Sequence, residues 1–163
     1  MSWRPPEPLT SEHSTIDFSC GIKSLDNWLK RRAFANQTSG ATRTFVASVD
    51  GKVVGYYALA SGGISIRSAV GNFRRNMPDP IPVVILARLA IDSSFQGQGL
   101  GRALFRDAAL RVVQSADTIG IRGIIVHAIS AEAKDFYIAL GFNVSPLEPM
   151  TLMVTISDLR DLL

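Results

Sequence analysis

A glycine-rich segment past the middle of the chain has residue types suited to phosphate binding. It reads Gln96-Gly97-Gln98-Gly99-Leu100-Gly101 and lies between an apolar stretch and a stretch with helical periodicity. Glycines let the backbone approach a phosphate closely, and the free N–H groups at a helix start point toward bound anions. Arg102, just inside the expected helix, adds a guanidinium for the same phosphate. The segment therefore predicts a ligand that contains phosphate.

Three classes of nucleotide-binding loop compete for this segment. A P-loop needs Gly-Lys-Ser/Thr, which is absent. A dinucleotide fold needs G-x-G-x-x-G near the start of a βαβ unit, whereas this segment reads G-x-G-x-G past mid-chain, after expected antiparallel strands. The third class is the pyrophosphate loop of acetyl-CoA acyltransferases, Q/R-x-x-G-x-G/A, which Gln96, Gly99 and Gly101 match at every position. The spacing favours this third class.

Hydrophobic patterning predicts a helix and a hairpin in the first half of the chain. Apolar side chains recur at helical spacing over 23–38, namely Leu25, Trp28, Leu29 and Ala33. Residues 42–49 and 52–60 are rich in Val, Phe and Tyr, and the Asp50-Gly51 pair between them predicts a two-residue hairpin turn. The second strand can run on to Ile66, with Gly62-Gly63 marking a bend or bulge. The Pro-rich start, up to Pro8, is expected to be a lead-in.

Beyond residue 69 the pattern alternates between strands and helices. We expect a loop over 69–82, strands over 83–91, 123–129 and 151–156, and helices over 102–114 and 131–140. The first of these helices is expected to point Leu104, Ala108, Leu110, Val112 and Val113 inward. The predicted class is α/β (α+β): one domain over 1–163 with a mixed, mostly antiparallel sheet flanked by helices.

Composition limits the function classes. Apolar residues make up 47% and charged residues 19% of the 163, as in a globular domain, and no stretch reaches the length of a membrane span. With no apolar leader, we expect a cytoplasmic protein. Cys20 is the single cysteine, so no internal disulfide and no metal site are expected. The net charge of +3 is too small to indicate a nucleic-acid partner. Of the 17 basic residues 13 are Arg, which fits either phosphate binding or a genome that favours Arg codons.

From Leu9 to Leu163 the chain resembles the GNAT acetyltransferase superfamily, and more closely the GNAT toxins of bacterial toxin–antitoxin modules, which acetylate aminoacyl-tRNA. The Gln96 loop carries the superfamily resemblance. The match also includes Phe18-Ser19 and Phe136 to Phe142, and the toxin resemblance rests on Cys20-Gly21, Pro80 to Asp92, Leu152-Met153 and Asp158-Leu159. The resemblance implies the GNAT fold and acetyl-CoA as cofactor.

The resemblance also implies roles for individual residues. Tyr137 is the expected catalytic acid, which protonates the departing thiolate of coenzyme A. In this family the strand before the loop splays from its neighbour and its backbone holds the pantetheine arm. The expected cofactor-binding residues are Leu89, Ala90, Ile91, Gln96, Gly97, Gln98, Gly99, Leu100, Gly101, Arg102, Ala103 and Phe136. Many members have an Asn that contacts coenzyme A where Ser130 stands. This chain departs from the family pattern at that position.

No general base stands out. His127 lies in an apolar strand and is expected to be a packed or hydrogen-bonded core residue, His13 has no visible partner, and Glu132 and Asp135 are expected to be solvated. An α-amino group has a pKa near 8, and esterification to tRNA lowers it further, so much of this amine is free at neutral pH. An aminoacyl-tRNA substrate therefore suits a site with an acid and no dedicated base, better than a protein lysine does.

The expected partners follow from the toxin resemblance. An aminoacyl-tRNA substrate requires phosphate contacts, for which the candidates are Arg74, Arg75, Arg88, Lys30, Arg31 and Arg32, although each taken singly also fits a solvated surface charge. A ribbon-helix-helix antitoxin and a homodimer are expected. Two alternatives stay open: an acetyltransferase of a small amine, drug or protein N-terminus, and a non-catalytic acyl-CoA-binding module.

Overall fold

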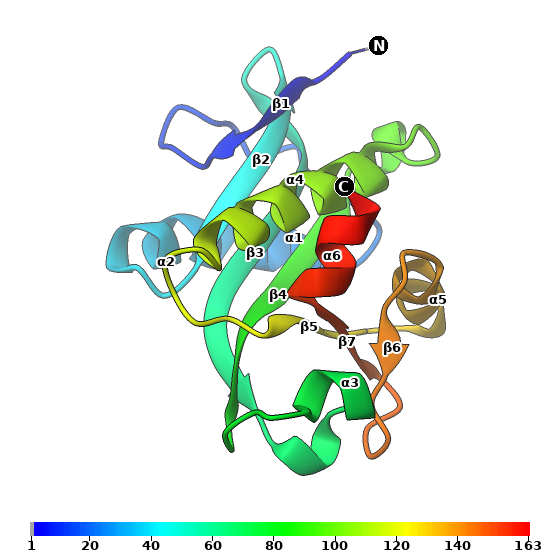
Figure 1. Ribbon diagram of the computed structural model, residues 1–163. Helices are drawn as coiled ribbons and strands as arrows, with labels where there is room; N and C mark the ends of the chain where they lie inside the picture. Colours follow the sequence, from blue (N-terminus) through cyan, green and yellow to red (C-terminus); the bar gives the residue numbers. More distant parts are fainter. Residues whose placement is uncertain (1) are drawn as a thin grey trace. The chain divides into compact units, whose positions relative to one another are not determined.

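The computed structural model describes residues 2–163 and contains a sheet with the strand order β1-β2-β3-β4-β5-β7-β6 (Figure 1). The strands are β1 (Arg4–Pro8), β2 (Arg43–Val49), β3 (Lys52–Ile64), β4 (Ile81–Ile91), β5 (Gly123–His127), β6 (Asn143–Val144) and β7 (Thr151–Thr155). Strands β4 and β5 are parallel, whereas β1–β2, β2–β3, β5–β7 and β6–β7 are antiparallel. The expected mixed, mostly antiparallel sheet is confirmed.

The helices account for most of the remaining chain. They are α1 (Lys23–Trp28), the π-helical turn η1 (Leu29–Ala33), α2 (Phe34–Ser39), η2 (Ile66–Ser68), α3 (Gly71–Arg74), η3 (Ser93–Phe95), α4 (Leu100–Ser115), α5 (Ala131–Ala139) and α6 (Ile156–Leu162). No helix among residues 2–163 is both long and apolar enough to cross a bilayer.

The chain divides into two compact units, each with its own core. Unit 1 is Met1–Ala60 with Ala87–Ala108, and unit 2 is Ser61–Leu86 with Ala109–Leu163. Strands β3 and β4 each pass from one unit into the other. A single domain over 1–163 remains a prediction.

The core of unit 1 forms where α1 and η1 cover one face of β2 and β3. Phe18, Leu25, Leu29 and Tyr56 are buried there, and the Tyr56 hydroxyl donates to the Leu25 carbonyl at 2.7 Å. This bond satisfies the polar end of an otherwise apolar ring, which would be costly to bury unpaired. The expected helix over 23–38 is confirmed, with the π-turn as a local widening within it.

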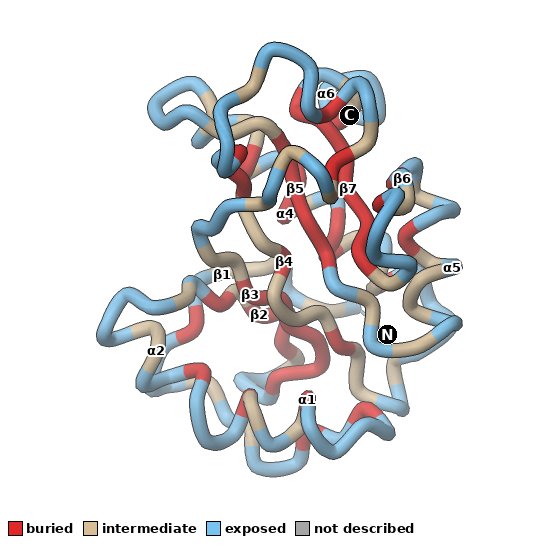
Figure 2. Tube along the Cα trace, turned by 90° about the horizontal axis from the view of Figure 1, so that it is seen from below, coloured by how far each residue is buried: buried red, intermediate tan, exposed pale blue. Residues whose placement is uncertain are grey.

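The core of unit 2 lies along β5 and β7, whose buried positions are red in Figure 2. Ile125 and Met153 pack there with Phe73 of α3. Arg122, just before β5, donates to the Phe73 carbonyl at 2.9 Å and to the Asn72 carbonyl at 2.6 Å. These bonds tie the α3 segment to the start of β5.

Two expectations about elements were wrong, and one element was not predicted. The Pro-rich start is not a lead-in: it forms β1, which is possible because proline, lacking a backbone donor, is tolerated on an edge strand. The chain end, for which no element was predicted, forms α6, where the Thr155 hydroxyl caps the start by accepting from Asp158 N at 3.1 Å. Leu110 is exposed at 39% instead of buried, because it lies on the outer face of α4.

The hairpin prediction is confirmed in its turn geometry. Asp50 and Gly51 have φ values of 50° and 79°, the left-handed conformation that a two-residue hairpin turn requires. Gly62 lies within β3, where a β-carbon would overlap the Ile85 side chain of β4. Close approach of the two strands is therefore a sufficient reason for this glycine.

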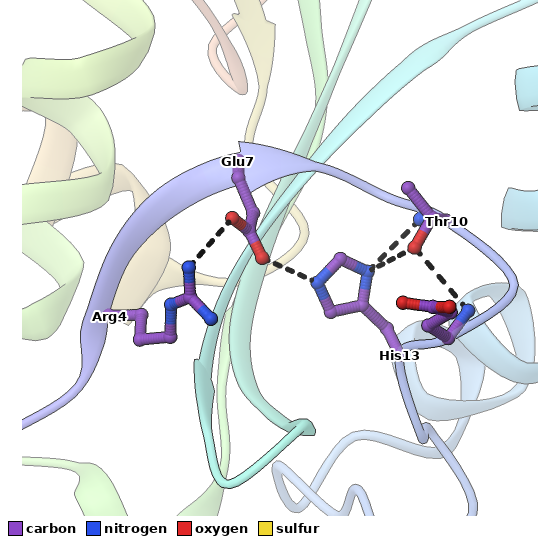
Figure 3. Close-up of polar contacts among 5 residues, drawn as sticks. Arg4, Glu7, Thr10 and His13 are labelled. Carbon is purple, nitrogen blue, oxygen red and sulfur yellow. Dashed lines mark hydrogen bonds and ion pairs between the residues drawn. The ribbon is translucent and has the colours of Figure 1, made fainter.

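Polar side chains tie β1 to the loop that follows it (Figure 3). Glu7 Oε1 lies 2.9 Å from His13 Nε2, and the Arg4 guanidinium lies 3.7 Å from Glu7 Oε2. The Thr10 backbone N–H donates to His13 Nδ1 at 3.0 Å. Because a backbone N–H can only donate, Nδ1 is the unprotonated nitrogen and Nε2 carries the proton that points to Glu7. Both ring nitrogens are engaged, so His13 holds this segment and has no nitrogen left for base catalysis.

We expect acid to loosen this cluster through Glu7. The hydrogen bond with His13 holds the pKa of the Glu7 carboxyl below its usual range, and the Arg4 charge acts in the same direction. A carboxylate whose pKa falls on folding stabilises the native state above its unfolded pKa, and this contribution is lost as the pH falls through the folded value. The Glu7→Gln variant should therefore have a lower Tm than the wild type at pH 7 and approach it below about pH 4.

Glu12→Gln is the matched control for this measurement. The Glu12 carboxylate makes no hydrogen bond among residues 2–163, so its variant should follow the wild type at both pH values. A Tm gap for Glu7→Gln that is equally large at pH 7 and pH 3.5 would contradict the prediction.

Candidate functional site

The glycine loop has the strand–loop–helix geometry of an anion site. It follows the end of β4 and η3, and α4 begins at Leu100. Gly97 and Gly99 have φ values of 77° and 84°, a conformation that side chains strongly disfavour, and both are exposed. Ala103 N donates to the Gly99 carbonyl at 3.1 Å, so the N–H groups of the preceding first turn remain for an external acceptor. The loop therefore presents backbone donors and the positive end of a 16-residue helix.

Gln96 positions the loop instead of reaching out of it. Its amide nitrogen donates to the Cys20 carbonyl at 3.0 Å and to the Ile91 carbonyl at 2.9 Å. The side chain thus connects the end of β4 with the segment that precedes α1. Both amide hydrogens are used, so the contribution of Gln96 to anion binding is to fix the backbone of the loop.

Asp92 adds a second clamp at the same corner, which the sequence analysis did not single out. Its carboxylate accepts from Ser19 N at 3.0 Å, from Ser94 N at 3.0 Å and from the Ser94 hydroxyl at 2.7 Å. Burial alone would raise the pKa of Asp92, but the hydrogen bonds from Ser94 and Ser19 outweigh it and hold that pKa below its usual value. An acid placed directly after a buried strand and before a glycine loop is the signal that could have identified it.

Strand β4 extends several residues beyond the stretch that pairs with β5. The two parallel strands are paired at Val84–Ile124 and Ile85–Ile125, while β4 continues to Ile91. The expected pantetheine-binding residues, Leu89 to Ile91, lie in this continuation. Ala90 is buried in the unit 1 core, and Leu89 and Ile91 are half-buried. Backbone groups past the paired stretch have no β5 partner within the described chain, as a strand that binds a ligand through its backbone requires.

Arg88 is fixed on an aromatic side chain. Its guanidinium carbon lies 5.0 Å from the centroid of the Trp28 ring, and Nη1 donates to the Ala87 carbonyl at 2.8 Å. Trp28 in turn stacks on Tyr56 with 6.0 Å between centroids and 8° between planes. Among residues 2–163 no carboxylate pairs with Arg88. The guanidinium is held in place but its charge is not neutralised.

Tyr137 lies in unit 2, on α5, within an aromatic cluster. The ring is 6% exposed and makes edge contacts with Phe136 and Phe142, at centroid distances of 5.1 and 5.3 Å. Its hydroxyl makes no hydrogen bond within the described part of the chain. Burial raises the pKa of Tyr137 above its usual value, so the phenol keeps its proton at any physiological pH. Phe136 packs on Tyr137, and its expected contact with the cofactor remains a prediction.

Ser130 and His127 have structural partners. The Ser130 hydroxyl caps α5 by accepting from Ala133 N at 3.1 Å, so it serves the helix that bears Tyr137. His127 is hydrogen-bonded as expected, through Nδ1 to the Thr151 hydroxyl at 3.0 Å, but it is exposed and not in the core. It is the last residue of β5, where the strand reaches solvent. Glu132 and Asp135 are exposed on α5, as expected.

The structure divides the remaining candidates between the units. Unit 1 brings together the loop, Leu89 to Ile91, Arg88 and the exposed η1 residues Lys30 to Arg32. Unit 2 holds Tyr137, Phe136 and the exposed pair Arg74-Arg75 at the end of α3. Within residues 2–163 no cluster of three or more His, Cys, Asp or Glu side chains could hold a metal ion.

We expect Gln96→Ala to weaken acetyl-CoA binding more than it weakens the fold. Loss of two hydrogen bonds that hold the loop, each worth about 1 kcal/mol, should raise the Kd for acetyl-CoA by up to about thirtyfold. Isothermal titration of Gln96→Ala and of Gln114→Ala, an exposed glutamine at the far end of α4, measures the difference. Equal Kd values for the two variants would show that the clamp does not shape the site.

The chain is similar to known proteins along nearly its whole length. The family model described as acetyltransferase (GNAT) domain matches residues 40–144. A tRNA-acetylating toxin of Mycobacterium tuberculosis is 49% identical over 158 residues, which cover 97% of this chain and 95% of that protein. The solved structure of AtaT complexed with acetyl-methionyl-tRNAfMet is 27% identical with a TM-score of 0.89, covering 96% of this chain and 97% of that one. A point mutant of the AtaT toxin bound to the C-terminus of the antitoxin AtaR and acetyl-CoA is 28% identical with a TM-score of 0.81, covering 96% of each chain.

Proposed function

The chain belongs to the GNAT acetyltransferase family, and from this premise we propose that it is a toxin that moves acetyl from acetyl-CoA to the α-amine of aminoacyl-tRNA. The observation that carries the substrate class is the 49% identity to a tRNA-acetylating toxin over 97% of this chain. Acetylation removes the nucleophile of peptide-bond formation, so the product blocks translation.

The unit 1 loop fits the anionic end of acetyl-CoA, which supplies an activated acetyl thioester. Gly97 and Gly99 leave the loop backbone open, and the first turn of α4 directs N–H groups and Arg102 outward. Residues 96–103 would bind the pyrophosphate. Backbone groups of Leu89 to Ile91 would hold the pantetheine arm and polarise the acetyl carbonyl, as donors aimed at a developing oxyanion do. Phe136 would contact the cofactor from α5.

Tyr137 would act as the general acid. Its hydroxyl oxygen carries a proton that no other group among residues 2–163 accepts, and burial keeps that proton bound at neutral pH. This proton can pass to the sulfur that leaves the acetyl group. With Phe136 and Phe142 on its ring edges, the phenol has little freedom to move away.

No general base is needed for this acceptor. The engaged nitrogens of His13 and the exposed position of His127 give neither residue the setting of a base. The α-amine of an aminoacyl ester titrates below the value of about 8 of an ordinary α-amino group, so it reaches the site largely unprotonated.

The proposed partners are the tRNA of the substrate, an antitoxin and a second copy of the chain. Arg74, Arg75, Arg88, Lys30 and Arg31 would contact the tRNA backbone, and each is exposed or half-buried. A ribbon-helix-helix antitoxin would neutralise the toxin, which would form a homodimer and act in the cytoplasm. The structure of AtaT bound to the antitoxin AtaR supports an antitoxin as a partner.

The deciding experiment is acetyl transfer to total charged tRNA. Purified protein is incubated with labelled acetyl-CoA and charged tRNA, the RNA is digested, and acetylated aminoacyl-adenosine is identified by mass spectrometry. Label on the amino acid is the expected result. Absence of label, with acetyl-CoA still bound in a titration, would retain the family and overturn the proposed substrate.

A further inference from the structure

The aromatic stack of unit 1 ends in a cation that the fold itself does not neutralise. Trp28 lies at the last position of α1, stacked on Tyr56, with the Arg88 guanidinium 5.0 Å from its ring centroid. Tyr56 is fully buried and bonded to the Leu25 carbonyl. The ring that supports Arg88 is therefore anchored to both the helix and the sheet.

Arg88 keeps most of its donors for an external group. Of its five N–H bonds, the described chain accepts one, through the Ala87 carbonyl. A guanidinium placed over an aromatic ring is held there by cation–π attraction, and its planar fork matches two oxygens of a phosphate. The structure thus presents an anchored guanidinium with unused donors and an uncompensated positive charge.

The position of Arg88 favours the acceptor substrate over the coenzyme as the source of a bound phosphate. Successive residues of a strand point to opposite faces of the sheet. On β3, Tyr56 faces α1 and Trp28, while a β-carbon on Gly55 would meet Leu100 and Leu104 of α4. Arg88 lies on the α1 face with Trp28, whereas the pyrophosphate loop starts the helix on the other face. On β4, Arg88 directly precedes the backbone proposed to hold the acetyl group, so an anion bound there lies beside the reacting amine.

The helix around Trp28 carries a second sign of a binding surface. The π-turn η1 begins directly after Trp28, and wide turns of this type within α-helices are frequent at functional sites. Its residues Lys30, Arg31 and Arg32 are all exposed. The Trp28–Arg88 pair therefore adjoins three further positive charges, as a path for a polyanion requires.

We propose that Trp28 is a positioning residue that holds the Arg88 guanidinium for one backbone phosphate of the aminoacyl-tRNA. This inference rests on the proposed function and assigns part of its nucleic-acid contact. Trp28 acts through Arg88 and needs no contact of its own with the substrate.

A double-mutant cycle on the intact protein tests the pair, with charged tRNA as the probe. We expect Arg88→Gln to lower kcat/KM about tenfold and Trp28→Leu about three- to tenfold, mostly through KM. The double variant should be no worse than Arg88→Gln within about twofold, because Trp28 works only through Arg88. Trp28→Phe, which keeps an aromatic face and the fold, should retain activity within about threefold.

Salt dependence separates a phosphate contact from a general loss of structure. The slope of log kcat/KM against log salt should become shallower by about 0.7 in Arg88→Gln, as for one lost contact to a single strand. Lys52→Gln removes an exposed charge of unit 1 far from α1 in sequence and should keep the wild-type slope. An unchanged slope in Arg88→Gln, or additive losses in the cycle, would overturn the inference.

Acetyl-CoA titration assigns the phosphate to its source. The Kd for acetyl-CoA should stay within about twofold in the four variants of Trp28 and Arg88. An unchanged Kd would also show that these variants fold. A tenfold weaker Kd in Arg88→Gln would mean that the cation binds a coenzyme phosphate, which would overturn the inference but not the proposed function. A wild-type protein that leaves charged tRNA unlabelled would instead overturn the proposed function.

Discussion

Tyr137→Phe should lower kcat for acetylation of charged tRNA about 10²- to 10⁴-fold, the usual range for loss of a positioned general acid. The substitution removes one oxygen from a 6% exposed side chain whose hydroxyl has no bonding partner among residues 2–163. The edge contacts with Phe136 and Phe142 involve only the ring and are kept. The fold should therefore be unaffected, and the loss should appear in kcat with little change in KM.

The pH profile provides an independent check on this role. Since burial raises the pKa of Tyr137 above its usual value of about 10, the acid form persists as the pH rises. Wild-type kcat/KM should rise as the α-amine loses its proton and then stay level to about pH 9.5. A fall in rate between pH 8 and 9, or a Tyr137→Phe variant with more than about a third of the wild-type kcat, would exclude Tyr137 as the acid.

Local patterns predicted most of the fold, and the exceptions have physical causes. The hairpin at Asp50-Gly51 and the helix after the glycine loop are specified by residues within a few positions of each other. Strand β1 could not be predicted this way, because its two internal prolines suggest a break, and only the edge position beside β2 makes them acceptable. The close approach of Gly62 to Ile85 likewise depends on a partner 23 positions away in the sequence.

The residues of the site were predictable to different degrees. The loop motif named Gln96, Gly99 and Gly101, since spacing alone defines it, and of these only Gly99 is left-handed. The motif could not show that Gln96 donates to the Cys20 carbonyl, 76 positions away, or that the Asp92 carboxylate accepts from Ser19 N. Trp28 was assigned to the helix core by periodicity, and its contact with Arg88, 60 positions away, becomes visible only when α1 and β4 are packed together. Long-range polar contacts of this kind leave no signal in a single sequence.

Gly99→Asp should weaken acetyl-CoA binding about 100-fold more than Gly99→Asn. Both residues tolerate the left-handed conformation that the φ of 84° demands, so their backbone strain is similar. A β-carbon at this position meets no atom within 4 Å, so both side chains can be accommodated in the free protein. They differ by one negative charge, whose repulsion with a bound phosphate about 5–6 Å away is about 3 kcal/mol at an effective dielectric constant near 20.

The comparison isolates charge because the two side chains have almost the same shape. Calorimetric titration with acetyl-CoA at low and high salt should show the Asp–Asn difference shrinking as salt rises, since exposed charges are screened. Similar Tm values would confirm that neither variant unfolds. If the two bind acetyl-CoA equally, the phosphates lie away from Gly99, and the backbone donors at the start of α4 would lose their assigned ligand. A difference that follows charge and salt together requires an anion bound at this loop.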